Sequence, residues 1–238
     1  MSIQILQVAN GSDSALEQAG KAAFDVMTEV PHDQPIVVGV CGGRSVVGFL
    51  RALQTQLSTR DQELVRRVHF FMVDERIVPL SSEESNYGAL KKMLFDSLIS
   101  DGVISQEQLH PFEATTTNAQ QRCIDYMSEL RLYGGRFSLV VLGVGEDGHV
   151  AGLFPQHPTL AVKGHGFECF SDSPKPPPAR MTATRDLVLA SRFGVLLVMG
   201  EAKREAWKAW NDASVVEQRC PAKMVKALPR GVVVTDIS

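Results

Sequence analysis

Short apolar runs alternate along the chain with segments in which apolar residues return every three or four positions. The runs contain few polar interruptions, which is typical of strands buried on both faces of a sheet. They cover residues 36–40, 68–73, 138–142 and 195–199, with strand-like runs also at 3–8 and 232–235. The periodic segments predict amphipathic helices at residues 14–30, 46–57, 87–98, 119–133 and 201–212. Because strand and helix alternate, the pattern predicts an α/β fold with a Rossmann-like, doubly wound, mostly parallel sheet and helices on both faces.

Proline and glycine positions mark where this pattern stops. Six prolines interrupt every period between Pro155 and Arg180, so this segment is expected to be irregular and to lie over the edge of the sheet as an active-site wall. Gly102 and Gly134-Gly135 mark two helix ends, and residues 12–15 and 200–203 resemble helix starts. No repeat or linker indicates a boundary, so residues 1–238 are expected to form a single domain.

The composition narrows the classes of partner. The chain carries 24 basic and 27 acidic side chains, a net charge of −3, and has no basic block, so nucleic acid is not an expected partner. Its first ten residues lack the features of a secretion signal, and no apolar run is long enough to cross a bilayer. The four cysteines form no C-x-x-C pair, and a core of this size needs no disulfides. A cytoplasmic protein with reduced thiols and no membrane contact is therefore expected.

The first strand-end loop has the composition of a phosphate site. Residues Gly42, Gly43, Arg44 and Ser45 follow the strand at 36–40 and open the next helix. Glycine N–H groups, a helix N-terminus and a guanidinium gathered at one point suit a phosphate monoester. The alternative is a tight strand-to-helix turn in which Ser45 is the N-cap.

Three charged residues, Asp74-Glu75-Arg76, end the strand at 68–73. Open parallel sheets bind ligands at this carboxyl edge, so the triplet is a candidate for the site. The alternative is a set of solvated turn residues or a local ion pair. Farther along, either Ser85 or Asn86 is expected to cap the following helix.

The loop after the strand at 138–142 reads Gly-Val-Gly-Glu-Asp-Gly-His over residues 143–149, which matches a dinucleotide fingerprint by letter. Two carboxylates would repel a diphosphate, and Pro155 and Pro158 leave no room for the crossover helix that such a site requires. We therefore expect no NAD site. A histidine beside Glu146 and Asp147 suits proton transfer, so His149 is a candidate general acid/base, with a purely structural histidine as the alternative.

Two further basic residues are candidates for binding an anion. Arg180 emerges from the proline-rich segment and Lys203 follows the strand at 195–199, although each taken singly is typical of a surface charge. The histidines at 149, 157 and 165 recur every eight residues, with Cys169 nearby. That interval fits neither helix nor strand, so we expect no metal site.

Taken in order, these motifs resemble the glucosamine-6-phosphate isomerase/6-phosphogluconolactonase family nearly from end to end. The matching elements are residues 42–45, 74–76 with 78–79 and 85–87, 143–149 with 153–155, 175–177 with 180–182, and Gly200 with Lys203. The resemblance implies a Rossmann-like parallel sheet, no cofactor and a sugar-phosphate lactone as substrate. The implied reaction is hydrolysis of the δ-lactone of 6-phosphogluconate in the oxidative pentose phosphate pathway.

The resemblance also implies roles for single residues. Gly43, Arg44 and Ser45 match the family's phosphate loop, and Gly42 is placed with them. Arg180 and Lys203 match phosphate-contacting positions, His149 matches the catalytic histidine, and Asp74 and Arg76 match active-site positions. Two departures affect local geometry more than chemistry: Val46 stands where the family usually has proline, and residues 150–152 read Val-Ala-Gly in place of Thr-Ala-Ser.

Two rival functions remain beside the lactonase. The deaminase branch of the family shares the Asp-Gly-His element but continues into a Phe-Asn-Glu-Pro segment whose acid assists ring opening. Here Leu153-Phe154-Pro155 lacks that glutamate, which favours the lactonase. The other rival is a non-enzymatic sugar-phosphate sensor. The sequence does not define the oligomeric state, and a monomer is slightly favoured.

The mechanism expected for a lactonase uses one histidine twice. Neutral His149 takes a proton from the attacking water and returns it to the ring oxygen. Either Asp147 or Asp74 orients the imidazole, and the sequence does not choose between them. Arg76 is expected to stabilise the oxyanion. Three basic residues are expected to hold the remote phosphate: Arg44, Arg180 and Lys203.

Overall fold

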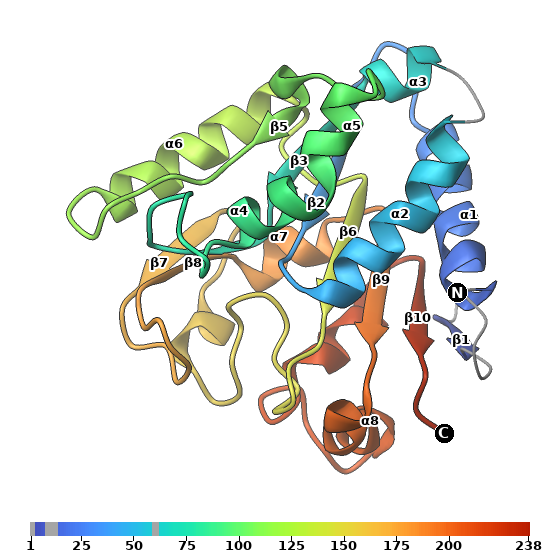
Figure 1. The fold of residues 1–238 in the computed structure, drawn as a ribbon. Coiled ribbons are helices and arrows are strands. Elements are labelled where there is room, and N and C mark those ends of the chain that lie inside the picture. The colour runs from blue at the N-terminus through green and yellow to red at the C-terminus, as the bar shows by residue number, and fades with distance from the viewer. Residues whose placement is uncertain (1–2, 8–13, 59–61) are drawn as a thin grey trace.

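A seven-stranded sheet forms the centre of the computed structural model, which describes residues 3–7, 14–58 and 62–238 (Figure 1). All neighbouring strands in it are parallel, in the order β1-β10-β9-β6-β2-β3-β5. The strands are β1 (Gln4–Gln7), β2 (Ile36–Val40), β3 (Val68–Met72), β5 (Leu109–His110), β6 (Leu139–Gly143), β9 (Phe193–Val198) and β10 (Gly231–Thr235). The expected Rossmann-like, doubly wound α/β fold is confirmed.

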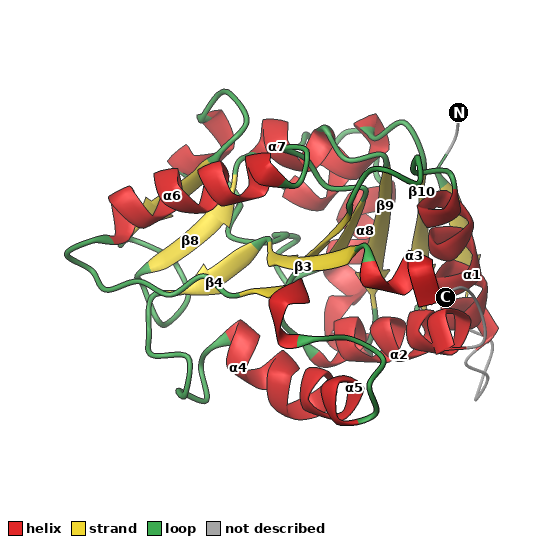
Figure 2. Ribbon diagram, turned by 90° about the horizontal axis from the view of Figure 1, so that it is seen from above, coloured by secondary structure: helices red, strands yellow, loops and turns green. Residues whose placement is uncertain are grey.

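Helices cover both faces of this sheet. Figure 2 shows α6 and α7 on one side and α2, α4 and α5 on the other. The helices are α1 (Ser14–Thr28), α2 (Arg44–Ser58), α3 (Gln62–Arg66), α4 (Asn86–Leu90), α5 (Asp96–Ser100), α6 (Ala119–Leu132), α7 (Arg185–Leu189) and α8 (Arg204–Asn211). On α1 a buried residue returns every four positions, at 15, 19, 23 and 27, which is the amphipathic pattern of a helix packed on a sheet. No helix among the described residues has the length and hydrophobicity needed to cross a membrane.

The expected helices are present, but two of them are subdivided. The helix expected at 87–98 is α4, then a π-helical turn η1 (Lys91–Phe95), then α5. The helix expected at 201–212 begins with a 3-10 turn, η4 (Glu201–Lys203). Helices α3 and α7 and the 3-10 segment η5 (Pro221–Ala227) were not expected, because each is too short for an apolar period to repeat. Residue 8 of the first expected strand and residues 12–13 of the first helix start lie outside the described residues.

A second sheet corrects the expectation that residues 155–180 are irregular throughout. It is antiparallel, in the order β4-β8-β7, and consists of β4 (Asp74–Arg76), β7 (Phe167–Phe170) and β8 (Arg180–Ala183). Strand β7 and a 3-10 turn η3 (Pro158–Ala161) lie inside that segment. Burial alternates along β7 over four residues only, a signal too short to stand out among so many prolines. Because β4 follows directly from β3, the second sheet extends from the carboxyl edge of the main sheet.

A disulfide bond joins α6 to the second sheet. It pairs Cys123 with Cys169, whose Cα atoms are 6.7 Å apart, whereas Cys41 and Cys220 are buried free thiols. The expectation of four reduced cysteines is therefore wrong for this pair. The two residues are 46 positions apart in the chain, and the packing of α6 on β7 brings them together. No local sequence pattern indicates such a contact.

Tyr126 on α6 connects two strands at the edge of the main sheet. Its side chain is fully buried. The hydroxyl accepts the backbone N–H of Met72 at 2.8 Å and donates to the carbonyl of His110 at 2.6 Å. Met72 ends β3 and His110 ends β5, so one hydroxyl satisfies a backbone group on each strand. Burial raises the pKa of Tyr126, which keeps the hydroxyl protonated and able to donate.

Replacing Tyr126 by phenylalanine is expected to lower the free energy of unfolding by about 1–3 kcal/mol, because two buried backbone groups lose their partner while the ring volume is kept. Urea denaturation measures this change. The matched control is Tyr133→Phe, whose hydroxyl makes no hydrogen bond to another described residue, and its effect is expected to stay within about 0.5 kcal/mol. Equal stabilities for the two variants would contradict this role of Tyr126.

Candidate active site

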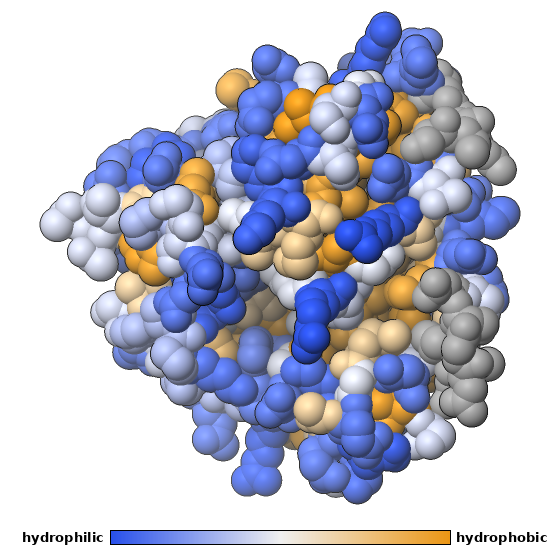
Figure 3. Space-filling model, in the orientation of Figure 1, coloured by the Kyte–Doolittle hydropathy of each residue, from blue (hydrophilic) through white to orange (hydrophobic). Residues whose placement is uncertain are grey.

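The loops after three neighbouring strands enclose one cavity at the carboxyl edge of the main sheet. Strands β9, β6 and β2 are adjacent and parallel, so the loops that follow them meet at the lower edge of the sheet in Figure 1. The cavity has a volume of about 660 Å³. The molecular surface is hollowed in this region, with hydrophilic side chains around the hollow (Figure 3). Its lining includes Gly42, Gly43, Arg44, Ser45, Gly143, Gly145, His149, Gly200 and Lys203.

The cavity lies where the strand order reverses. On one side of β2 the sheet continues through β3 and β5, and on the other through β6, β9 and β10. A reversal of this kind leaves a crevice at the carboxyl ends of the strands, which is the usual ligand site of an open α/β sheet. The topology therefore indicates the same position as the sequence motifs.

The loop between β2 and α2 has the geometry of an anion site. Gly43 has a φ of 117°, a conformation that favours glycine, and α2 begins at the next residue. A Cβ at Gly42 would lie 2.1 Å from Oδ1 of Asn86, so no side chain fits there. Arg44 and Ser45 line the cavity at the N-terminus of α2, where the helix dipole favours negative charge.

Lys203 reaches the same cavity from the loop after β9. Because β9 and β2 flank β6, Lys203 and Arg44 come from opposite sides of the loop that carries His149. Neither cation takes part in an ion pair within the described ranges. The structure thus brings five of the six predicted phosphate residues together, namely Gly42, Gly43, Arg44, Ser45 and Lys203.

His149 is paired with Asp147. Nδ1 of the imidazole lies 2.5 Å from Oδ1 of Asp147, and the backbone N–H of His149 donates to the same oxygen at 3.2 Å. Burial alone would raise the pKa of Asp147, but the hydrogen bonds and charge of His149, together with Lys175, hold it well below its usual range. Asp147 is therefore an ionised partner for Nδ1, and Nε2 is the ring nitrogen left for a reacting molecule.

Close packing fixes this pair. A Cβ at Gly145 would lie 2.0 Å from Nδ1 of His149 and 2.8 Å from Oδ1 of Asp147, so only glycine leaves room for the two side chains. The backbone N–H of Gly145 donates to the carbonyl of His149 at 2.8 Å, which closes the loop. The buried ring of Phe154 packs on the imidazole with the ring centroids 4.6 Å apart.

Asp74 is buried and is held by Asn86. The Asn86 amide donates at 3.1 Å to both the carbonyl and Oδ2 of Asp74. Burial and the hydrogen bond and charge of Asp74 raise the pKa of the neighbouring Cys41 thiol. Since Asn86 also packs against Gly42, Asp74 supports residues 42–45, called the anion loop below. The geometry pairs Asp147 rather than Asp74 with His149.

Glu75 anchors the start of α4. Its carboxylate accepts the backbone N–H groups of Asn86 and Tyr87 at 2.7 and 2.8 Å and the hydroxyl of Ser85 at 3.1 Å. Burial raises its pKa in spite of these hydrogen bonds. Ser85 is the N-cap of α4, with its side chain accepting from Gly88. The alternative of solvated turn residues is therefore wrong for Asp74 and Glu75, which are both buried.

Arg76 and Arg180 face each other across β4 and β8, and neither is among the residues that line the cavity. Nη1 of Arg76 donates to the carbonyl of Glu84 at 2.5 Å, while its buried Nε has no hydrogen-bond partner in the described part of the chain. The guanidinium of Arg180 is bound to carbonyls of residues 175–177 and lies 5.5 Å from the Phe154 ring centroid. Burial and the charge of Arg76 lower the pKa of Arg180.

Three residues of the site were not assigned to it from the sequence. Each was named only as a member of a motif, with Asn86 also a candidate helix cap and Phe154 also a departure from the deaminase motif. Nζ of Lys175 lies 3.7 Å from Oδ2 of Asp147. The motifs at 85–87, 153–155 and 175–177 contained all three, but only the tertiary contacts indicate what each side chain does.

His157, one of the three regularly spaced histidines, has polar partners of its own. His157 bonds to Thr159 and Asp172, at 2.9 and 3.2 Å. Within the described ranges no three His, Cys, Asp or Glu side chains form a group that could hold a metal ion.

The fold and the cavity define an α/β protein with an anion loop and an Asp–His pair at one switch point. The chain belongs to the family of glucosamine-6-phosphate isomerases/6-phosphogluconolactonase, whose model matches residues 11–234. A 6-phosphogluconolactonase of Borreliella burgdorferi is 35% identical over 208 residues, which cover 87% of this chain and 86% of the relative. The human 6-phosphogluconolactonase is 32% identical over 72% of this chain and 66% of its own length.

Solved structures match the whole fold. A 6-phosphogluconolactonase from Thermotoga maritima superposes with a TM-score of 0.79 at 24% identity, over 98% of this chain and 99% of that one. A monomeric glucosamine-6-phosphate deaminase superposes with a TM-score of 0.77 at 17% identity, over 98% and 97% of the two chains. Because a lactonase and a deaminase both match, these similarities establish the fold and do not distinguish the reactions.

Substituting alanine for Gly145 is expected to break the His149–Asp147 contact, because the new Cβ overlaps the imidazole. Proton NMR checks this through the downfield imidazole N–H signal of His149, which the variant is expected to lose. The signal is assigned by its absence in His149→Asn, because His110 and Glu129 form a second short histidine–carboxylate contact. Gly166→Ala is the matched control, since a Cβ there meets nothing within 4 Å. If the signal persists in Gly145→Ala, glycine is not what makes the pair possible.

Proposed function

We propose that this chain hydrolyses 6-phospho-D-glucono-1,5-lactone to 6-phosphogluconate, as a 6-phosphogluconolactonase of the oxidative pentose phosphate pathway. The observation that carries the proposal is the combination, in one cavity, of an anion loop and the Asp147–His149 pair. The name of the relative that is 35% identical over most of the chain supports the same reaction.

The phosphate of the substrate is proposed to bind at the N-terminus of α2. Backbone N–H groups around Gly42 and Gly43, the Ser45 hydroxyl and two cations, Arg44 and Lys203, all border the cavity there. Charge-assisted hydrogen bonds of this kind are about twice as strong as neutral ones. Their binding energy holds the lactone in place so that its carbonyl meets His149. Arg180 remains a predicted phosphate contact, although the hydrogen bonds described above already occupy its Nε and Nη2.

The proton transfer is assigned to Nε2 of His149. With Nδ1 hydrogen-bonded to ionised Asp147, the neutral imidazole accepts a proton from water as that water attacks C1 of the lactone. The imidazolium, stabilised by Asp147, then returns the proton to the ring oxygen as the tetrahedral intermediate collapses. Acid/base catalysis of this kind typically contributes about a hundred- to ten-thousandfold in rate.

The second sheet is proposed to assist from one side of the site. Arg76 has a buried Nε that lacks a partner among the described residues, which supports the predicted role of stabilising the oxyanion. Asp74 holds Asn86 and, through it, the anion loop. We therefore assign the orienting role to Asp147 and a supporting role in the site to Asp74.

The deaminase alternative is favoured only by the similar fold of a solved deaminase. That reaction needs a carboxylate that assists ring opening, which the family resemblance assigns to the segment at 153–155. In this chain Leu153 and Phe154 are both fully buried, and the Phe154 ring packs directly on the imidazole. An aromatic ring therefore occupies a place beside His149 that would otherwise be open to an acid, which supports the lactonase.

A paired assay tests the function. The purified protein is expected to accelerate hydrolysis of 6-phosphogluconolactone above its spontaneous rate and to release no ammonia from glucosamine 6-phosphate. Unphosphorylated glucono-δ-lactone is expected to react with a kcat/KM that is lower by at least about a hundredfold, because it lacks the phosphate contacts. Ammonia release without lactone hydrolysis would instead establish the deaminase, and the absence of both activities would favour a sensor.

A further inference from the structure

Asp147 contacts two basic side chains, His149 and Lys175. Its Oδ1 contacts Nδ1 of His149 at 2.5 Å, and its Oδ2 lies 3.7 Å from Nζ of Lys175. The side chains of Asp147 and Lys175 are 32% and 40% exposed, so both are partly shielded by protein. Lys175 comes from the proline-rich segment after β7, whereas Asp147 and His149 belong to the loop after β6.

A network of hydrogen bonds fixes the backbone that carries Lys175. The hydroxyl of Ser173 donates to the carbonyl of Lys175 at 2.9 Å and accepts the backbone N–H of the same residue at 3.2 Å. The backbone N–H of Ser173 donates to the carbonyl of Pro178 at 3.1 Å, which closes the bend. The backbone of Lys175 is therefore held in place, even though its ammonium group is partly exposed to solvent.

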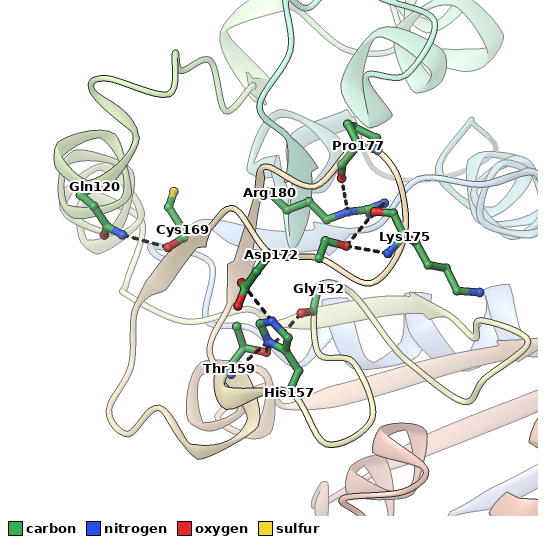
Figure 4. A network of polar contacts seen from close by, with 10 residues as sticks. Gln120, Gly152, His157, Thr159, Cys169, Asp172, Lys175, Pro177 and Arg180 are labelled. Carbon is green, nitrogen blue, oxygen red and sulfur yellow. Dashed lines mark hydrogen bonds and ion pairs between the residues drawn. The ribbon is translucent and has the colours of Figure 1, made fainter.

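Arg180 completes this network from inside the bend. Its Nε donates to the carbonyl of Pro177 at 3.1 Å, and its Nη2 donates to the carbonyls of Pro176 and Lys175 at 2.8 and 3.3 Å. Figure 4 shows Arg180 pointing into the bend while the side chain of Lys175 extends out of it. The buried guanidinium thus shapes the segment that presents the lysine.

We propose that Lys175 is a positioning residue, an inference that rests on the proposed lactonase function. Its ammonium group anchors Oδ2 of Asp147 and thereby holds Oδ1 against the imidazole of His149. The lysine has a second effect through its charge. A carboxylate with no other partner would favour the imidazolium form of His149, and an imidazolium cannot accept a proton from water. By compensating part of the charge of Asp147, Lys175 limits how strongly that carboxylate favours the imidazolium. Arg180 contributes to the same end by fixing residues 175–177.

If Lys175 only stabilised the fold, its removal would lower the stability of the protein and leave the pH profile unchanged. Ion pairs with this degree of exposure contribute little to stability, so we expect Lys175→Met to remain folded. Direct contact between Lys175 and the substrate would raise KM and leave the acid limb of kcat/KM at the same pH. A positioning role changes the pH profile itself, because the titrating group is His149.

The experiment compares Lys175→Met and Lys175→Arg with Lys163→Met, which removes an exposed charge elsewhere in the same segment. Loss of the cation leaves the charge of Asp147 uncompensated beside His149, so the acid limb of kcat/KM is expected to move up by about 0.5 pH unit in Lys175→Met. At pH values below the midpoint of that limb, kcat/KM of Lys175→Met is expected to be about threefold lower than that of the wild-type protein. Lys175→Arg is expected to restore the wild-type profile, and Lys163→Met is expected to match it. An unmoved limb in Lys175→Met, or no rescue by arginine, would overturn the proposal.

A second measurement does not depend on catalysis. The imidazole of His149, assigned by its absence in His149→Asn, is titrated by NMR in the wild-type protein and in the two methionine variants. The pH midpoint of this titration is expected to rise by about 0.5 pH unit in Lys175→Met and to stay unchanged in Lys163→Met. If the wild-type protein hydrolyses no lactone, the proposed function is wrong, and this titration still decides whether Lys175 acts on the pair. Equal midpoints in the two methionine variants would overturn that action.

Discussion

The parallel pairing of β6 between β2 and β9 is the constraint on which the site depends. Val40 pairs with Val141, which in turn pairs with Val195, so the three strands are in fixed register and their loops open into one cavity. These strands are buried along nearly their whole length. A shift in register would displace the apolar contacts on both faces, and the core therefore determines where Arg44, His149 and Lys203 meet.

The second, antiparallel sheet supports the loops of the main sheet. Glu75 holds the start of α4, Asp74 holds Asn86 against Gly42, and Arg180 fixes the bend that presents Lys175. Each of these ionisable groups is buried and is hydrogen-bonded to nearby neutral groups, as buried polar groups require. Arg44, His149 and Lys203, which border the cavity, lie on the loops of the parallel sheet. In the second sheet, Arg76 and Arg180 are proposed to reach the substrate, whereas Asp74 and Glu75 keep the neighbouring segments in place.

Much of the fold was predictable because its signals are local. Six apolar runs and the helical periods located the main sheet, and loops after parallel strands must gather at one edge. This is why Gly42–Ser45, His149 and Lys203 were found from the sequence. The choice between Asp147 and Asp74 was not predictable, since both lie on strand-end loops and only the tertiary contacts distinguish them. Strand β7, the Cys123–Cys169 bond and the contact of Lys175 with Asp147 arise from packing between distant segments, which leaves no periodic signal.

Proton transfer by His149 is the central claim, and the turnover number of His149→Ala tests it most directly. Hydrolysis of 6-phosphogluconolactone, corrected for the spontaneous rate, is compared with binding of 6-phosphogluconate measured by calorimetry. His165→Ala is the control, since His165 is exposed. The expected result is a fall in kcat of about a hundred- to ten-thousandfold in His149→Ala, with product affinity unchanged within about threefold. An unchanged kcat in this variant would contradict the claim.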